Sequence, residues 1–311
     1  MSHAAAAMPS MKLVHWIVLL LIALFFGSSF PLTNVAVREF SPLTVAATRM
    51  VISAPLVWLV LRAAGLRLPP VGRAWRPFVI LGVVGATVPY VAISWGQKHI
   101  TSGLGGILIA SIPVYTVLLA PLITRDEHFS AIRVGGAALG LAGVAYAIGP
   151  ANLATLDEQV FGASLTLIAA LGYALGGMVV RLYRDMPPLI LTAGQFIVAG
   201  TILIPLAAVA GAADFSAPSR TAVLCLIGVG TIGTALPTMM LFWLIGKAGV
   251  TNASLISFFM PFAAVGIGAV ALGETVPREA FIGLMVILAS AVIVNWGARF
   301  MTGRSGAGRG E

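Results

Sequence analysis

Long apolar runs alternate with short polar joins along almost the whole chain. A helix needs about 20 mostly apolar residues to cross the hydrocarbon core of a membrane. Ten segments meet that requirement, at residues 13–37, 42–64, 75–97, 101–124, 130–149, 160–182, 188–210, 220–246, 250–272 and 279–299. Because the joins are short, consecutive helices are expected to form antiparallel hairpins. The pattern predicts an all-α integral membrane protein with ten transmembrane helices.

Composition agrees with burial in lipid. Apolar residues make up 59% of the 311 residues and charged residues only 9%, against roughly 25% charged residues in a typical soluble domain. Ionisable side chains are costly in hydrocarbon, which explains their scarcity. The single cysteine, Cys225, excludes a disulfide framework and a cysteine-rich metal site. The sequence predicts no cofactor and no metal.

The first segment begins like a secretory signal, with Lys12 followed by an apolar stretch. Its apolar run continues from Leu13 to Val37, which is long enough to span the membrane, and further spans follow. We therefore expect an uncleaved first helix and not a signal peptide.

The net charge of +8 does not indicate a nucleic-acid partner, because the basic residues lie at the ends of the apolar segments. Of the 18 Lys and Arg residues, 13 fall on one side of the predicted membrane and 4 on the other, with Arg49 inside a span. Basic residues are enriched on the cytoplasmic side of membrane proteins. The charges predict cytoplasmic N- and C-termini in a bacterial inner membrane.

A shift of 148 residues brings the second half of the chain into register with the first. Matched pairs at this offset include Pro89 with Pro237, Trp95 with Trp243, Pro113 with Pro261, Gly82 with Gly230 and Gly135 with Gly283. Five helices per repeat is an odd number, so the halves would cross the membrane in opposite senses, as in many secondary transporters. We expect five-helix repeats at 1–149 and 160–301, followed by a disordered cytoplasmic tail at 303–311.

Several motifs carry a resemblance to a known family. They are the first-helix sequence Phe26-Gly27-Ser28-Ser29-Phe30, Pro42 with Arg49, Ser111-Ile112-Pro113-Val114, and Gly273-Glu274. With these the chain resembles the drug/metabolite transporter superfamily, specifically its ten-helix EamA-type members, and among them the YddG-like amino-acid exporters. The resemblance implies export of amino acids or similar small metabolites by alternating access. One departure is Thr124-Arg125-Asp126-Glu127, where the family usually shows Gly-Glu. The other is Gln195, which matches Arg49 in the second half at an offset of 146 residues, the offset that also matches Pro42 with Pro188.

Arg49 is the only strongly basic residue well inside a predicted span. One interpretation is a charge partner that clamps a substrate carboxylate. The alternative is an arginine that bonds backbone carbonyls between helices or extends its head toward the interface.

Prolines and polar residues inside the spans supply the remaining site candidates. Pro89, Pro113, Pro237 and Pro261 are candidate hinges, since proline frees a backbone carbonyl and kinks a helix; static kinks are the alternative. A substrate cavity is expected to be lined by Ser29, Asn34, Tyr90, Ser94, Ser111, Tyr173, Trp243 and Ser257. Alternatively, these hydroxyls bond their own helices and the aromatic rings face lipid.

An intramembrane enzyme would need His, Asp or Glu at membrane depth, and every such residue lies at a predicted span end, in a loop or in the tail. We therefore expect no enzyme, and facilitative transport of a small-molecule substrate. An exporter of drugs or other neutral metabolites, or a lipid-intermediate flippase, remains an alternative. Membrane lipid is the other expected partner. Glycine strings indicate close helix packing within a monomer or in a weak dimer.

Overall fold

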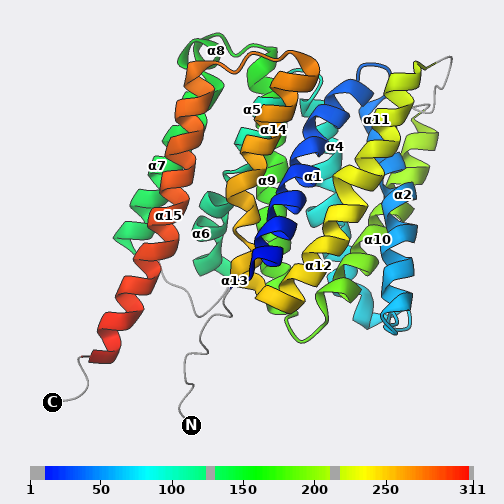
Figure 1. The fold of residues 1–311 in the computed structure, drawn as a ribbon, viewed down its shortest axis with the longest axis horizontal. Helices are drawn as coiled ribbons and strands as arrows, with labels where there is room; N and C mark the ends of the chain where they lie inside the picture. Colours follow the sequence, from blue (N-terminus) through cyan, green and yellow to red (C-terminus); the bar gives the residue numbers. More distant parts are fainter. Residues whose placement is uncertain (1–10, 124–129, 211–217, 308–311) are drawn as a thin grey trace.

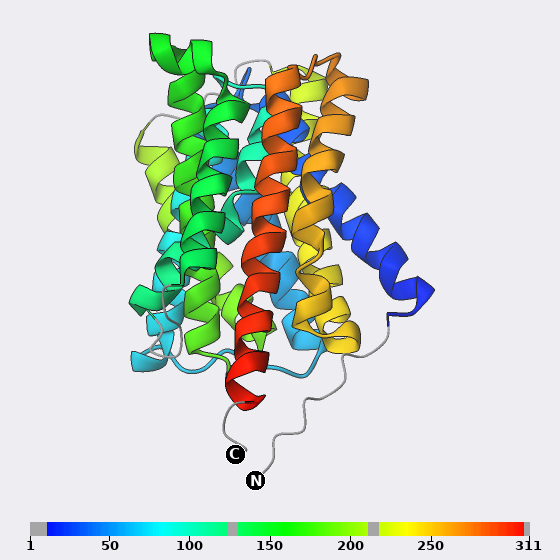
Figure 2. The same cartoon turned by 90° about the vertical axis from the view of Figure 1, so that its left-hand side faces the viewer.

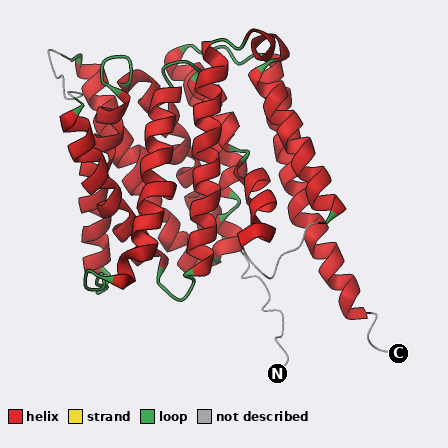
Figure 3. Cartoon of the chain, turned by 180° about the vertical axis from the view of Figure 1, so that it is seen from behind, coloured by secondary structure: helices red, strands yellow, loops and turns green. Residues whose placement is uncertain are grey.

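The computed structural model describes residues 11–123, 130–210 and 218–307. Within those ranges every regular element is helical and no strand occurs (Figure 3). Among the described residues, eight helical stretches are long and apolar enough to cross a membrane, and Ile256–Leu272 forms a shorter apolar helix. The prediction of an all-α membrane protein is therefore confirmed.

The helices are α1 (Leu13–Ala36), α2 (Pro42–Ala63), α3 (Arg76–Gly82), α4 (Val88–Gly96), α5 (Ser102–Ile109), α6 (Ile112–Ile123), α7 (Ala131–Ile148), α8 (Pro150–Thr155), α9 (Glu158–Leu182), α10 (Pro188–Val209), α11 (Arg220–Gly230), α12 (Leu236–Ala248), α13 (Val250–Ala253), α14 (Ile256–Leu272) and α15 (Arg278–Ala307). A short 3₁₀ turn, Arg73–Trp75, precedes α3. The helix α15 runs past Gly303, where the sequence predicted a disordered tail, and residues 308–311 lie outside the described ranges.

Two of the long stretches contain a π-helical segment. Val83–Thr87 lies between α3 and α4, and Thr231–Ala235 lies between α11 and α12. The two segments have equal length and are separated by the same 148 residues that relate the sequence matches. Each is followed by a helix with proline in its first turn, Pro89 in α4 and Pro237 in α12. Since proline lacks an N–H, it removes the helical bond to the carbonyl four residues earlier.

Two other stretches are interrupted outright. The helices α5 and α6 are separated at Ala110 and Ser111, and α13 and α14 at Ser254 and Leu255. Pro113 follows the first interruption and Pro261 lies inside α14. Pro89, Pro113 and Pro237 therefore lie beside irregular parts of the spans. Pro261 lies within the apolar helix α14.

Helices from the two halves of the chain interleave (Figures 1 and 2). The most extensive contacts join α7 with α15, α1 with α14, α2 with α10, and α4 with α9. In every one of these pairs, one helix comes from the first half and one from the second. We call the end of the bundle at Leu13 the lower end and the end at Ala36 the upper end, as they appear in Figure 1.

The α7–α15 pair packs through glycine. A Cβ added at Gly143 would lie 3.0 Å from the Ile287 nitrogen and 3.1 Å from the Gly283 oxygen. Gly283 in turn lies against the backbone of Gly143 and Ala147. The glycine string that begins at Gly136 therefore packs helices within one chain.

This close approach predicts a position-specific effect of a larger side chain. Gly143→Val should lower the thermal stability of the purified protein by about 1–3 kcal/mol, because overpacking forces the two backbones apart. Gly135→Val on the same helix is the matched control, since nothing lies within 4 Å of a Cβ there. The melting temperature in detergent is the measurement, and equal melting temperatures for the two variants would contradict this packing.

Candidate functional site

A central cavity of about 480 Å³ lies between the two halves. Most of its wall is apolar, with contributions from Phe26, Phe30, Ile93, Phe196 and Leu241. Polar groups gather on part of the wall: Ser29, Arg49, Tyr90, Tyr173, Thr192, Gln195, Thr234 and Thr238. A mostly apolar cavity with a few convergent polar groups is the usual form of a small-molecule site.

Arg49 on α2 is the charged residue of this wall, and its side chain is only 3% exposed. Its guanidinium donates to the hydroxyls of Ser29 at 3.2 Å and Thr33 at 3.0 Å. Its Nε has no hydrogen-bond partner in the described part of the chain. In the same ranges, the ion pair found is His99 with Glu158, so Arg49 is buried without a carboxylate. Burying a charge is costly unless it is paired, so this wall favours an anionic group.

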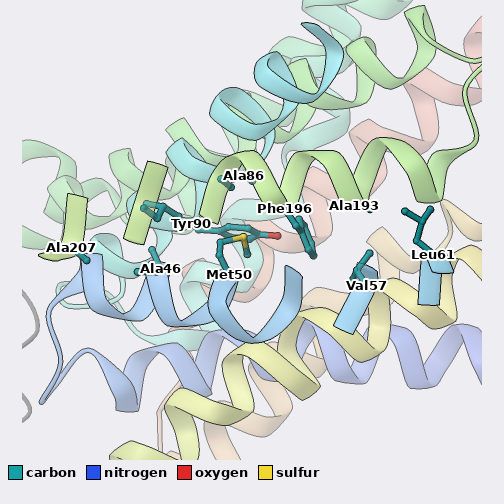
Figure 4. Close-up of a cluster of buried hydrophobic side chains, with 12 residues drawn as sticks. Ala46, Met50, Val57, Leu61, Ala86, Tyr90, Ala193, Phe196 and Ala207 are labelled. Atoms are coloured by element: carbon teal, nitrogen blue, oxygen red, sulfur yellow. The ribbon is translucent and has the colours of Figure 1, made fainter. Parts of the chain in front are cut away.

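Tyr90 covers the other side of the guanidinium. The centre of its ring lies 4.5 Å from the Arg49 Cζ, a cation–π contact. The ring is held edge-on by Tyr173 at 6.3 Å and by Phe196 at 6.5 Å between centroids. Figure 4 shows Tyr90 beside Met50 and Phe196, in the buried cluster between α2 and α10. Packing therefore fixes the ring against which Arg49 rests.

Gln195 on α10 forms a hydrogen bond with the backbone of the first π-helical segment. Its Nε2 donates to the Gly85 carbonyl at 3.0 Å. Gly85 is the residue four before Pro89, so its carbonyl is the one that proline deprives of a helical bond. Gln195 thus joins the second half of the chain to the irregular backbone beside the cavity.

The cavity extends toward the lower end, and hydrogen bonds join helices at the upper end. Its lining includes Val180, Pro188 and Ile245, which lie near the lower ends of α9, α10 and α12. At the upper end, Asn34 donates to the carbonyls of Gln97 at 2.9 Å and Ile100 at 3.2 Å. This contact joins α1 to the connection between α4 and α5.

Two carboxylates add links between the halves at the upper end. Glu274 accepts hydrogen bonds from the Ser102 nitrogen at 2.9 Å, the Ser102 hydroxyl at 2.8 Å and the Gly103 nitrogen at 3.1 Å, at the start of α5. Glu39 accepts from the Ser219 hydroxyl at 2.7 Å and nitrogen at 2.6 Å, just before α11. The Ser219 hydrogen bonds hold the pKa of the Glu39 carboxyl below its usual value. Neither carboxylate lines the central cavity.

The structure brings together part of the set expected from sequence. Ser29, Arg49, Tyr90 and Tyr173 line one cavity. Asn34 lies instead at the upper end, and Ser94 is fully buried outside the cavity lining.

The remaining three candidates also lie outside the cavity lining. Ser111 and Ser257 donate to the carbonyls of Leu108 and Ser254, beside the helix interruptions. Trp243 is 42% exposed, with His15 against the edge of its ring. Helix interruptions free carbonyls that short hydroxyls satisfy locally, which explains the two serines. Asp126 and Glu127, noted in the sequence, lie outside the described residues.

Sequence reasoning missed several residues of the wall, among them Gln195, Phe196 and Thr234. A signal for Gln195 was present, because it occupies the repeat position that matches Arg49. For Phe196 and Thr234, the sequence contains no repeat match of this kind that would have indicated a place in the cavity wall.

Comparison with known proteins gives consistent matches over both halves. The sequence profile of the EamA-like transporter family matches residues 14–149 and again 160–296. The chain is 26% identical to the chloroplastic WAT1-related protein At3g02690 of Arabidopsis thaliana, over 91% of this chain and 70% of that protein. It is 25% identical to the uncharacterized inner membrane transporter YedA of Escherichia coli K12, over 88% of each chain.

Two further similarities are to a curated exporter and to a solved structure. A probable terminal-alkyne amino-acid exporter of Streptantibioticus cattleyicolor is 24% identical over 89% of this chain and 92% of its own length. One crystal structure superposes with a TM-score of 0.61 at 18% identity, covering 94% of this chain and 99% of the other. That structure supports the fold alone.

The bond from Gln195 predicts a stability effect that is separate from transport. Gln195→Leu should cost about 1–3 kcal/mol, since it leaves the buried Gly85 carbonyl unpaired. Thr201→Val on the same helix is the control, because the Thr201 hydroxyl bonds only to Val198 of its own helix and the residue is exposed. Thermal unfolding in detergent measures both, and a Gln195→Leu protein as stable as the control would show that the bond does not matter.

Proposed function

The chain belongs to the EamA-like transporter family, and we propose that it exports small solutes that carry a carboxylate, amino acids first among them. The observation that carries the proposal is Arg49, a buried cation with no acidic partner in the described part of the chain, in the wall of the central cavity. A carboxylate bound there would supply the missing counter-charge through charge-assisted hydrogen bonds.

The surroundings of Arg49 support a zwitterion with an apolar side chain. The hydroxyls of Tyr173 and Thr238 lie in the same wall and can accept from an ammonium group. The aromatic and aliphatic remainder of the wall suits an apolar side chain. The one buried charge of the wall is positive, which disfavours an organic cation as the substrate. The similarity to an amino-acid exporter points the same way.

The fold supports alternating access between two five-helix repeats that cross the membrane in opposite senses. The paired π-helical segments, 148 residues apart, are one support. Helix contacts are another: exchanging each helix for its repeat counterpart converts the α4–α9 contact into α12–α1, which is also present. In this proposal, ten helices cross an inner membrane, both termini are cytoplasmic, and the described conformation faces inward.

The proposal predicts that transport depends on the charge of Arg49. In proteoliposomes, Arg49→Gln should reduce uptake of labelled L-leucine by about ten- to a hundredfold, the effect of losing a charge-assisted hydrogen bond. Arg62→Gln on the same helix is the matched control, because Arg62 is exposed near the lower end and only approaches Trp58.

Competition by analogues extends this test. In the parent protein, 4-methylpentanoate, which keeps the carboxylate of leucine, should compete with L-leucine, whereas 3-methylbutylamine, which lacks it, should not. A panel of labelled amino acids covers the possibility that leucine is not carried. Equal competition by the amine would contradict recognition of the carboxylate.

We also propose that transport is facilitative. Among the described residues, the wall of the central cavity includes no Asp, Glu or His, the groups that usually carry a coupled proton inside a membrane. Proteoliposomes with equal L-leucine on both sides and an imposed pH gradient should therefore show no net accumulation. Accumulation abolished by an uncoupler would overturn this proposal without affecting the role of Arg49.

A further inference from the structure

A second cavity, also of about 480 Å³, lies at the upper end of the bundle. We call it the upper vestibule and define it by the polar residues Asn34, Arg38, Gln97, Lys98, His99 and Glu274. It shares no lining residue with the central cavity. Its wall contains two permanent cations, Arg38 and Lys98, and one carboxylate, Glu274.

The side chains of the upper vestibule differ in how many hydrogen bonds or ion pairs they already make within the protein. The Glu274 carboxylate accepts three hydrogen bonds at the start of α5. His99 lies 3.3 Å from Glu158. Arg38 donates to the Asn34 Oδ1 at 2.9 Å, which steadies its guanidinium. With two permanent cations and one carboxylate, the wall of the vestibule carries a net positive charge.

Gln97 is the residue of the upper vestibule whose side chain is buried without a hydrogen-bond partner in the described part of the chain. Its side chain is 1% exposed, and neither its Oε1 nor its Nε2 has a partner in the described part of the chain. A buried polar group without a partner is costly, and such groups are rare in native structures. One amide offers both a donor and an acceptor, which matches a solute that carries an ammonium and a carboxylate.

Gln97 also lies where the two cavities approach each other. A Cβ added at Gly105 would clash with the Gln97 amide and would lie 3.1 Å from a ring carbon of Phe30. Phe30 lines the central cavity and Gln97 lines the upper vestibule. A layer made of Phe30, Gly105 and Gln97 therefore separates them, and a solute that crosses it meets the Gln97 amide.

We propose that the upper vestibule is a second binding site for the same carboxylate-bearing solutes, in which Gln97 bonds the solute and Arg38 and Lys98 attract its carboxylate. A solute leaving the central cavity passes from one cationic site to another. The inference rests on the proposed function for its choice of solute, but the site and its residues are separate from Arg49.

The test is protection of a cysteine reporter. Cys225 is the single cysteine, so Cys225→Ser combined with Gln159→Cys places one thiol at the wall of the upper vestibule. A membrane-impermeant maleimide is applied from the upper side, and its labelling rate is measured against L-leucine concentration. Leucine should slow labelling in this parent, and no slowing would overturn the proposal.

Gln97→Leu in the same background should raise the half-protecting leucine concentration about tenfold, the effect of losing a direct hydrogen bond. Its melting temperature should be unchanged or higher, because an apolar side chain replaces two unpaired buried atoms. If Gln97 only stabilised the fold, Gln97→Leu would lower the melting temperature and leave the half-protecting leucine concentration unchanged. Unchanged protection in Gln97→Leu would overturn the proposal.

Arg49→Gln separates this inference from the proposed function. Protection of the reporter should persist in Arg49→Gln although transport falls, and loss of protection there would show that leucine acts only through the central cavity. If Arg49→Gln transported normally, the proposed function would fail while the vestibule result stood. Gly105→Ala, which displaces the Gln97 amide, should weaken protection. The matched control is Gly103→Ala, whose Cβ would make ordinary contacts from 3.5 Å.

Discussion

Backbone hydrogen bonding in hydrocarbon is the constraint on which the rest of this structure depends. With no water in the bilayer core, each carbonyl that a helix releases must find a partner within the protein. Pro89 leaves the Gly85 carbonyl without its helical hydrogen bond, and Gln195 from the other half of the chain donates a hydrogen bond to it. Ser111 and Ser257 do the same locally beside the two helix interruptions. Both π-helical segments border the central cavity, the first through Gly85 and the second through Gly233 and Thr234.

Polar and aromatic neighbours explain how one strong cation can lie in the cavity wall. Arg49 is surrounded by hydroxyls and by the face of Tyr90, which stabilise the guanidinium without neutralising it. A carboxylate side chain beside it would have made a closed ion pair and left nothing for a solute to bind. On the proposed function, leaving the Arg49 guanidinium without a carboxylate partner keeps it available to an anionic group, at the expense of some stability.

Most of the architecture could be predicted from the sequence because apolar run length and proline position act locally. The offset of 148 residues anticipated the spacing of the π-helical segments, since Pro89 and Pro237 impose the same backbone problem in each half. The lining of the central cavity was predicted only in part. Whether a serine faces a cavity or bonds its own helix depends on where the helix breaks, as Ser29 and Ser111 illustrate. Exposure of Trp243 depends on which neighbour covers it, and no local pattern encodes that.

The contacts that join helices at the upper end suit the alternating access proposed above, because they can open at a low cost in free energy. They are hydrogen bonds made by Asn34, Glu39 and Glu274, and the Glu39 contact is exposed to solvent. Such bonds contribute about 0.5–3 kcal/mol each, because water replaces them when they open. A closure made of interlocked apolar side chains would have to expose that surface to water in the open state, at about 25 cal/mol per Å². Joining the upper end by hydrogen bonds would therefore keep the free-energy difference between a conformation with these bonds and one without them small. In the proposed alternating-access cycle, binding of a carboxylate at Arg49, which would itself contribute only a few kcal/mol, would then shift the balance between them.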